Sequence, residues 1–189
     1  MWLLSCCLVS GVALGAELPM VDWGRWSQAD LAQLIASNRH ITAPGERIAA
    51  LSAPFLETPY AAGTMIGDPQ TAERLVVNLA GFDCFTFLDV VEALRRASDL
   101  ADFEVQLQQV RYFGGDVDYA RRRHFFSDWV AADAAAIADV TAAVGQGRAR
   151  LVVKQLNRKS DGTPWLPGIP VVRREVSYIP TEQVDAAVL

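Results

Sequence analysis

The sequence predicts one domain that combines helices with a small number of strands, and three observations support this prediction. The chain has 189 residues, which is enough to bury one core of ordinary size. Its composition, 51% hydrophobic and 21% charged, is that of a globular protein. Apolar residues recur with helical spacing in several segments, and strand-like runs follow toward the end, with no internal repeat.

The N-terminal segment 2–16 is uncharged and almost entirely apolar or small. It is too short to span a bilayer and has the length of a signal-peptide core, although it lacks the usual basic n-region. We therefore expect a signal peptide over 1–16, one mature domain over 17–189, and export to the bacterial periplasm without a membrane span. Two alternatives remain: a lipid anchor on Cys6, whose lipobox-like lead-in LLSC is short, and a buried N-terminal helix.

The first predicted elements of the mature domain are helical. Ser27 followed by Asp30 forms a capping pair, and the apolar residues after it share one face, so we expect a helix over 28–38. A second helical segment starts at Pro44, and Pro54 kinks or ends it.

The middle of the chain is predicted to hold a loop, a short strand and two further helices. The loop covers 58–68 and the strand 74–79. Apolar residues with a period of about 3.6 place a mostly buried helix over 84–97, and another helix covers 102–111. The segment 112–129 is rich in Gly, Asp and aromatic residues, so we expect an ordered functional loop there.

The C-terminal part is predicted to contain an Ala-rich helix over 131–144 and then two strands, 150–156 and 172–179. A threonine cap at Thr181 with an acidic first turn starts one more helix, which has no C-cap before Leu189. Both a fragment and a fraying terminal helix explain this pattern.

Charge and composition exclude some functions. A net charge of −5 gives no electrostatic reason to expect nucleic acid, and the short basic run 121–123 has acidic neighbours. The carboxylates show no metal-ligand spacing with histidine or cysteine, so we expect neither a metal nor a cofactor. Four tryptophans have two interpretations, as the lining of a carbohydrate-binding groove or as packing residues in the core and loops: Trp23, Trp26, Trp129 and Trp165.

A lone cysteine, Cys84, stands where a turn gives way to the predicted helix 84–97. Two of the three cysteines, Cys6 and Cys7, lie in the predicted leader, so the exported chain keeps one thiol and forms no internal disulfide. A helix N-terminus stabilises both a thiolate and an oxyanion. Cys84 is therefore either the nucleophile of a cysteine hydrolase or a small buried hydrophobe. Asp83 before it either caps the helix or faces the substrate.

Several separate runs resemble a known family. The run Thr58-Pro59-Tyr60 … Gly63-Thr64 … Phe82-Asp83-Cys84-x-Thr86-Phe87 resembles the NlpC/P60 group of papain-like cysteine hydrolases. The longer runs LVVNLAGFDCFTFLDVVEAL, RYFGGDVDYARRRHFFSDW and VKQLNRKSDGTPWLPGIPVVRREVSYIP are similar to its DUF1460 branch, described as N-acetylmuramoyl-L-alanine amidase-like. The resemblance extends from about residue 25 to the end of the chain.

The resemblance implies an α+β, papain-like fold with helices packed on an antiparallel sheet, in a monomeric exported enzyme. It implies hydrolysis of amide bonds in the stem peptides of peptidoglycan or muropeptides. Cys84 is then the nucleophile and Tyr60 the tyrosine whose hydroxyl lies beside it. Asp83 occupies a position where relatives help to hold the amine end of the peptide, and Thr86 and His124 are further candidates for substrate binding.

Two departures from the family pattern matter. Phe85 occupies a position where the family tends to have a small hydroxyl residue. The family's catalytic histidine, in a His-Val-Gly-like or His-Thr-Gly-like motif, has no counterpart in this sequence. Of the two histidines, His40 is expected at the surface, and His124 is expected to be a structural or substrate-loop residue hydrogen-bonded near Asp128. The sheet is then expected to be incomplete, with an open apolar edge.

Three classes of function remain after this comparison. The first is a cysteine amidase whose base lies in a missing segment, so that the domain is C-terminally truncated. The second is a catalytically inactive cell-wall-binding remnant without the general base. The third is a thiol redox or structural protein, which is the weakest because no second cysteine resolves an oxidised Cys84.

Overall fold

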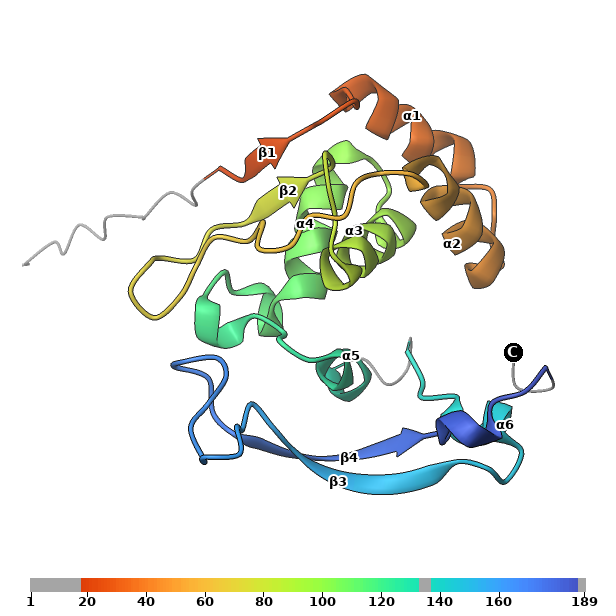
Figure 1. Ribbon diagram of the computed structural model, residues 1–189. Coiled ribbons are helices and arrows are strands. Elements are labelled where there is room, and N and C mark those ends of the chain that lie inside the picture. Colours follow the sequence, from red (N-terminus) through yellow and green to blue (C-terminus); the bar gives the residue numbers. More distant parts are fainter. Residues whose placement is uncertain (1–17, 133–136, 187–189) are drawn as a thin grey trace, which may run out of the picture.

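The computed structural model describes residues 18–132 and 137–186, which form two lobes connected through α5 (Phe126–Ala132) (Figure 1). The helical lobe, residues 18–125, holds helices α1 to α4 and a parallel pair of strands. The ribbon lobe, residues 126–186, holds α5, α6 and an antiparallel pair of strands. The predicted signal peptide lies outside the described residues.

The helices of the helical lobe agree closely with the sequence prediction. α1 begins after Ser27, whose side chain and that of Asp30 form reciprocal cap hydrogen bonds. A short 3₁₀ turn that contains Pro54 ends α2, as expected for a proline at this place. The bounds are Gln28–Asn38 for α1, Pro44–Ser52 for α2, Cys84–Arg96 for α3 and Leu100–Arg111 for α4.

The sheet of the helical lobe is a parallel pair of strands, and it differs from the antiparallel sheet that the sequence led us to expect against the helices. β1 (Met20–Asp22) pairs with β2 (Val76–Asn78), with Val21 opposite Val77. The connection explains the direction, because α1 and α2 carry the chain back across the lobe before β2 starts. An antiparallel pair of strands exists, but it lies in the ribbon lobe.

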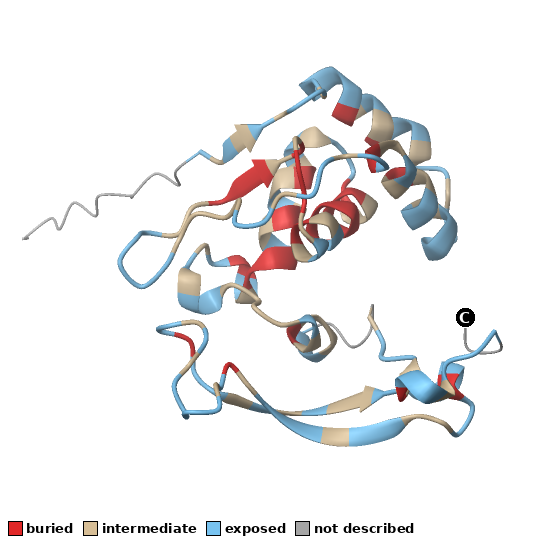
Figure 2. Ribbon diagram, in the orientation of Figure 1, coloured by how far each residue is buried: buried red, intermediate tan, exposed pale blue. Residues whose placement is uncertain are grey.

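The core of the structure lies in the helical lobe, where Figure 2 shows buried residues concentrated on α3, α4 and β2. Burying one large apolar side chain stabilises a fold by about 1.5–3 kcal/mol, so this cluster dominates the stability of the lobe. Its large members with at most 1% exposure come from α1 to α4, β2 and the segments that flank them: Leu31, Ile35, Leu51, Val77, Leu79, Val90, Leu94, Phe103, Leu107 and Tyr112.

A buried ion pair joins α3 to α4 inside this core. Arg111 Nε lies 2.8 Å from Asp89 Oδ2, and both side chains are 2% exposed. Arg111 also donates to the backbone carbonyl of Val76 in β2. Burial raises the pKa of Asp89, while the Arg111 guanidinium acts in the opposite direction. The pair therefore fixes α3, α4 and β2 relative to one another.

The ribbon lobe contains both strands predicted near the end of the chain, β3 (Arg150–Leu156) and β4 (Val172–Tyr178). Val153 lies opposite Glu175, and Leu151 shares their face because side chains alternate along a strand. Leu151 and Val153 are 64% and 49% exposed. Both side chains therefore lie on the outer face of the ribbon, opposite the face that contacts α5, whereas the sequence led us to expect an apolar edge.

The predicted Ala-rich helix over 131–144 is wrong as one element. α5 already starts at Phe126, inside the predicted loop, and α6 is a separate short helix, Thr141–Gly145. The backbone at 137–140 is not helical, and residues 133–136 lie outside the described part. Alanine favours a helix intrinsically, but helical stability in proteins comes mainly from packing an apolar face, and the described residues of this run are mostly exposed.

The helix predicted after Pro180 is only a 3₁₀ turn, Thr181–Gln183, in the described residues, and no side chain caps it. The last positions, 187–189, lie outside the described part. No helix within the described ranges has the length and apolarity needed to cross a bilayer.

Candidate active site

Cys84 is the first residue of α3, and it is exposed. The Asp83 carboxylate caps this helix, because its Oδ1 accepts the backbone N–H of Phe85 at 3.0 Å and that of Thr86 at 2.7 Å. The Thr86 hydroxyl donates to the same oxygen at 2.8 Å and accepts the Asp83 N–H at 3.0 Å. Local hydrogen bonds therefore fix the helical turn that carries the thiol.

The helix behind Cys84 is anchored in the core, which gives the thiol a rigid support. Thr86, Val90 and Leu94 are all buried on the inner face of α3. The helix N-terminus contributes a partial positive charge near the sulfur, and the Asp83 carboxylate contributes a negative one. The accepted hydrogen bonds spread part of that negative charge, so the cap holds the turn in place while it reduces the benefit of the dipole.

Tyr60 reaches the same region through a strand-like contact. Its backbone forms a parallel bridge with Phe82, two residues before the thiol. The Ala61 N–H donates to the Phe82 carbonyl at 2.9 Å, and the Phe82 N–H donates to the Pro59 carbonyl at 3.1 Å. The Tyr60 side chain is 75% exposed. The structure thus brings Tyr60 beside the segment that leads into Cys84.

A glycine makes this approach possible. A Cβ at Gly81 would lie 2.6 Å from Ala61 Cβ and 3.2 Å from the Pro59 carbonyl oxygen. Real Cβ atoms do not approach other atoms so closely, so any larger residue would push the bridged segment away. Gly81 therefore sets the spacing between the tyrosine segment and the entrance to α3.

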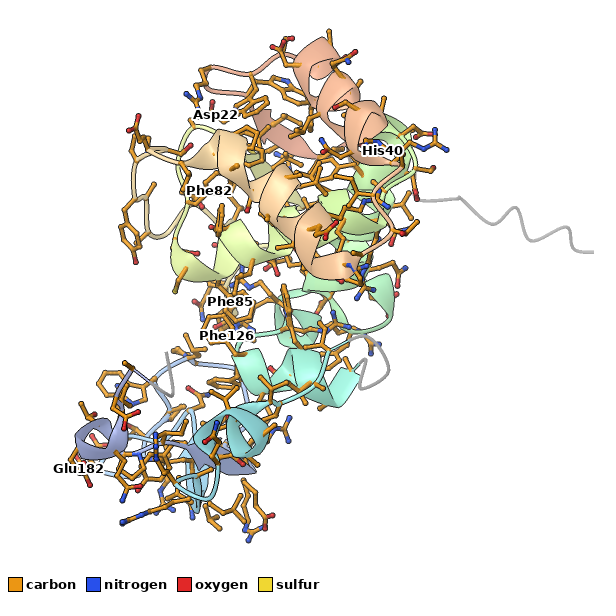
Figure 3. All side chains as sticks on the ribbon, turned by 90° about the vertical axis from the view of Figure 1, so that its right-hand side faces the viewer. Asp22, His40, Phe82, Phe85, Phe126 and Glu182 are labelled. Carbon is orange, nitrogen blue, oxygen red and sulfur yellow. The ribbon has the colours of Figure 1, made fainter. Side chains whose placement is uncertain are left out.

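Phe85 extends from the first turn of α3 toward α5, where it meets Phe126 (Figure 3). The two rings are stacked, with centroids 4.7 Å apart and planes at 17°. Trp129 meets Phe85 edge-on at 6.1 Å. Sequence reasoning missed this contact. Its only signals were an unusually large residue after the cysteine and the aromatic content of the segment 112–129.

His124 forms a different hydrogen bond from the one expected. Its Nε2 lies 2.9 Å from the Tyr119 carbonyl oxygen, and the two rings meet edge-on at 5.1 Å. Burial lowers the pKa of His124 and the Arg122 charge lowers it further, while the Tyr119 carbonyl and Asp128 act in the opposite direction. The expected hydrogen bond near Asp128 is therefore replaced by one to the Tyr119 carbonyl, five residues earlier in the chain.

The partners of the Asp128 carboxylate are the residue before α5 and an arginine of the ribbon. Asp128 Oδ2 accepts the backbone N–H of Phe125 at 3.1 Å, and Oδ1 accepts from Arg174 NH2 at 3.0 Å. Asp128 is 5% exposed. This carboxylate both caps α5 and ties it to β4.

The segment before α5 is held to the helical lobe by the carboxylate of Glu73. Its Oε1 accepts from the Tyr112 hydroxyl at 2.8 Å and from Arg122 NH1 at 3.1 Å. Burial raises the pKa of Glu73, and these two partners act in the opposite direction. Tyr112 has its own pKa raised, by burial and then by Glu73. The 112–129 segment is therefore ordered, as predicted, although it ends in a helix.

The predicted site residues separate into two groups. Cys84, Asp83 and Thr86 form one cap structure, and the backbone bridge brings Tyr60 next to it. Within the described residues the contacts of His124 are with its own segment rather than with this cap. The same part of the chain contains no group of three or more histidine, cysteine, aspartate or glutamate side chains arranged to hold a metal ion.

An exposed cysteine therefore lies at a capped and anchored helix N-terminus, whose first backbone N–H groups have no carbonyl partner within the helix. The chain belongs to the AmiA-like family, N-acetylmuramoyl-L-alanine amidase-like, whose family model matches residues 50–189. This confirms the family expected from the sequence. A search of curated proteins found no match.

Two solved structures share the arrangement of helices with a small sheet. A Legionella pneumophila protein of the DUF1460 family has a TM-score of 0.67 at 22% identity, over 86% of this chain and 67% of that one. An N-acetylmuramoyl-L-alanine amidase from Bacteroides uniformis has a TM-score of 0.56 at 24% identity, over 76% of this chain and 67% of that one. At these identities the likeness shows the fold, and the chain spans about two thirds of each relative's length.

Proposed function

We propose that this protein is an exported cysteine hydrolase of the papain-like NlpC/P60 kind that acts on amide bonds of peptidoglycan stem peptides in the periplasm. The observation that carries the proposal is an exposed thiol, Cys84, at the first position of a capped and buried helix in a chain of an amidase-like family. The family supports peptidoglycan or a muropeptide as the substrate.

The proposed reaction proceeds through an acyl-enzyme. The Cys84 thiolate attacks the amide carbonyl carbon, and the C–N bond then breaks as the amine leaves with a proton. Water hydrolyses the resulting thioester and regenerates the thiol. The backbone N–H of Cys84 is the oxyanion donor that we favour, because the next two N–H groups, of Phe85 and Thr86, are engaged by the cap.

The remaining site residues have supporting roles in this proposal. Tyr60 supplies a hydroxyl beside the thiol, which its exposure and its backbone bridge support. The cap hydrogen bonds use Oδ1 of Asp83, which leaves Oδ2 for the amine end of a peptide. Thr86 acts through Asp83, since its hydroxyl is engaged in the cap. His124 orders the loop beside the site through Tyr119.

The reaction also needs a base that takes the thiol proton. His40 lies in an exposed turn after α1, and His124 is engaged with Tyr119. We therefore propose that a histidine outside these 189 residues serves as the base. The alternative is a catalytically inactive cell-wall-binding protein. The hydrogen bond between His124 and Tyr119 favours it, because an engaged imidazole is not available as the base.

The decisive test compares the protein encoded by the complete gene with its Cys84→Ala variant. With purified muropeptides, the wild type should release stem peptides detectable by mass spectrometry. Removing the nucleophile should lower this rate by about 10³-fold or more. Val105→Ala, at an exposed position of α4, is the matched control and should retain the rate. Release by Cys84→Ala at the wild-type rate would exclude Cys84 as the nucleophile.

The DNA beyond the codon for Leu189 separates the two proposals. An open frame that encodes a His-Val-Gly-like motif supports the hydrolase. An immediate stop codon, together with a purified chain that binds muropeptides without cleaving them, supports the inactive wall-binding protein.

A further inference from the structure

A small cavity lies at the carboxyl ends of the parallel strands β1 and β2, whose arrows point toward the same end of the lobe in Figure 1. Ligands of α/β folds bind in crevices at this end of parallel strands, because neighbouring segments of the chain diverge there. The volume of the cavity is about 170 Å³. It is lined by the loops after β1 and β2 and by the turn after α2, including Gly24, Arg25, Glu57, Pro59, Leu79 and Ala80.

Backbone contacts, rather than flexible side chains, hold these segments together. A Cβ at Gly24 would lie only 2.6 Å from the Ala80 Cα, so a larger residue would push the two loops apart. Gly24 also has a φ of +54°, in the left-handed region that favours glycine. In the segment after α2, the Pro59 carbonyl accepts the N–H of Phe82 at 3.1 Å. The walls of the cavity are therefore fixed in position.

The cavity is lined by one side-chain charge of each sign. Arg25 contributes the positive charge, and its guanidinium donates to the Pro54 carbonyl and lies over the Trp26 ring, 5.8 Å from the ring centroid. Glu57 contributes the negative charge from a different segment. Because the described hydrogen bond of Arg25 goes to Pro54 rather than to Glu57, both charges remain for a ligand that carries the opposite ones.

Glu57 has an unusual backbone conformation. Its φ is 67°, in the left-handed region that a residue with a side chain rarely occupies. A glycine would adopt this conformation without strain, yet the position carries a carboxylate. Strain of this kind is typical of functional sites, where the placement of one side chain matters. The strain therefore indicates a use for the Glu57 carboxylate at the cavity.

The size and chemistry of the cavity fit a small free α-amino acid. At about 30 Å³ per water molecule, the volume holds about six waters, or a ligand with about as many non-hydrogen atoms, which matches alanine. A guanidinium binds a carboxylate and a carboxylate binds an ammonium, so the two walls suit the two ends of a zwitterion. Pro59 and Leu79 supply apolar surface for a small side chain.

We propose that this cavity binds a free α-amino acid with a small apolar side chain, with its carboxylate on Arg25 and its ammonium on Glu57. The residues that line the cavity do not include Tyr60, Asp83 or Cys84, so the site is separate from the candidate active site. The inference goes beyond the proposed function and does not depend on it.

The first test compares ligands on the wild-type protein encoded by the complete gene, by calorimetry and by NMR of the backbone amides. The probes are L-alanine, D-alanine, alaninamide, which lacks the carboxylate, and N-acetylalanine, which lacks the ammonium. We expect at least one alanine enantiomer to bind with a Kd of about 1 mM or lower and to shift the amide signals of Gly24 and Ala80. The amide and the N-acetyl derivative of that enantiomer should each bind about tenfold more weakly.

The second test assigns the two ends of the ligand. Arg25→Gln should bind alanine about tenfold more weakly than wild type and should bind alanine and alaninamide equally. Glu57→Gln should show the same loss and should bind alanine and N-acetylalanine equally. Arg39→Gln and Glu46→Gln are the matched controls, because they remove the same charges from exposed residues outside the cavity. Both controls should bind every probe as wild type does.

Failure of both alanine enantiomers to bind wild type would overturn the proposal, and this result needs no variant. Binding that either cavity variant leaves unchanged, or that the controls weaken to the same extent, would also overturn it. None of these measurements involves hydrolysis, so their outcome is distinct from the test of Cys84 as the nucleophile.

Discussion

At the scale of single residues, Asp83 holds the helical turn that carries the thiol. It accepts three hydrogen bonds from the first turn of α3 and sits next to Cys84 in the chain. Its capping keeps the turn in place, whereas its charge works against a thiolate. A variant that keeps the cap but removes the negative charge separates the two effects.

Replacing Asp83 tests this division. Asp83→Ala removes the cap and should lower the free energy of unfolding by about 1 kcal/mol. Asp83→Asn keeps an acceptor oxygen, so it should remain close to wild-type stability and alkylate faster at Cys84, because the negative charge is gone. Urea unfolding and iodoacetamide kinetics measure the two quantities. Equal alkylation rates in wild type and Asp83→Asn would show that the charge has no influence on the thiol.

His124 makes stability depend on pH. Its pKa is lowered in the folded state, first by burial, so the folded protein favours the neutral imidazole. The unfolded chain then binds more protons once the pH falls below the ordinary histidine value of about 6.5. Stability is therefore complete above that value and is lost as the pH falls through it toward the lower folded pKa.

A His124→Gln variant should lack this loss of stability at low pH. We expect the urea midpoint of wild type to fall more steeply than that of the variant between about pH 7.5 and 5.5. Glu73, whose pKa is raised, contributes with the opposite sign, but it is common to both proteins. Parallel midpoint curves would contradict the prediction.

At the scale of elements, one ion pair organises the helical lobe. Asp89 and Arg111 are almost fully buried, and together they join α3, α4 and β2. Removing one partner of such a pair leaves an uncompensated charge in the core, whereas replacing both by apolar residues leaves no buried charge.

The Arg111→Met variant should therefore be far less stable than wild type, by about 3–5 kcal/mol. The double variant Asp89→Leu/Arg111→Met should recover most of that loss, and a double-mutant cycle by urea unfolding measures the recovery. If the double variant is no more stable than the single one, Arg111 acts mainly through its bond to the Val76 carbonyl.

At the scale of the whole molecule, the ribbon lobe exposes apolar side chains on its outer face. Leu151 and Val153 lie exposed on the outer face of β3, and in the described residues β3 and β4 pair only with each other. Exposed apolar side chains on strands with open edges favour association between copies.

Replacing both residues by lysine should reduce this association. In Leu151→Lys/Val153→Lys the second lysine faces Glu175 across the ribbon, so the change in unfolding free energy should stay within about 0.5 kcal/mol. Val152→Lys, on the half-buried inner face, is the control and should destabilise the protein. Light scattering over a concentration series measures association, and unchanged scattering in the double variant would contradict the prediction.

Local signals were enough to predict much of the fold. The Ser27–Asp30 cap, the proline at the start of α2 and the apolar period of α3 each depend on residues within a few positions of one another. The elements they define have the predicted type and nearly the predicted ends. The prediction of one Ala-rich helix was wrong, because it rested on intrinsic propensity alone and the described residues of that run are mostly exposed.

The sequence by itself determined the family and the helix that begins at Cys84, because helix starts and motifs are local. It left open whether Asp83 caps that helix or faces the substrate, and the structure shows the cap. The parallel pairing of β1 with β2 and the stacking of Phe126 on Phe85 were decided only in three dimensions. Each joins residues from separate elements, and contacts at that range depend on which groups the packing of the whole chain brings together.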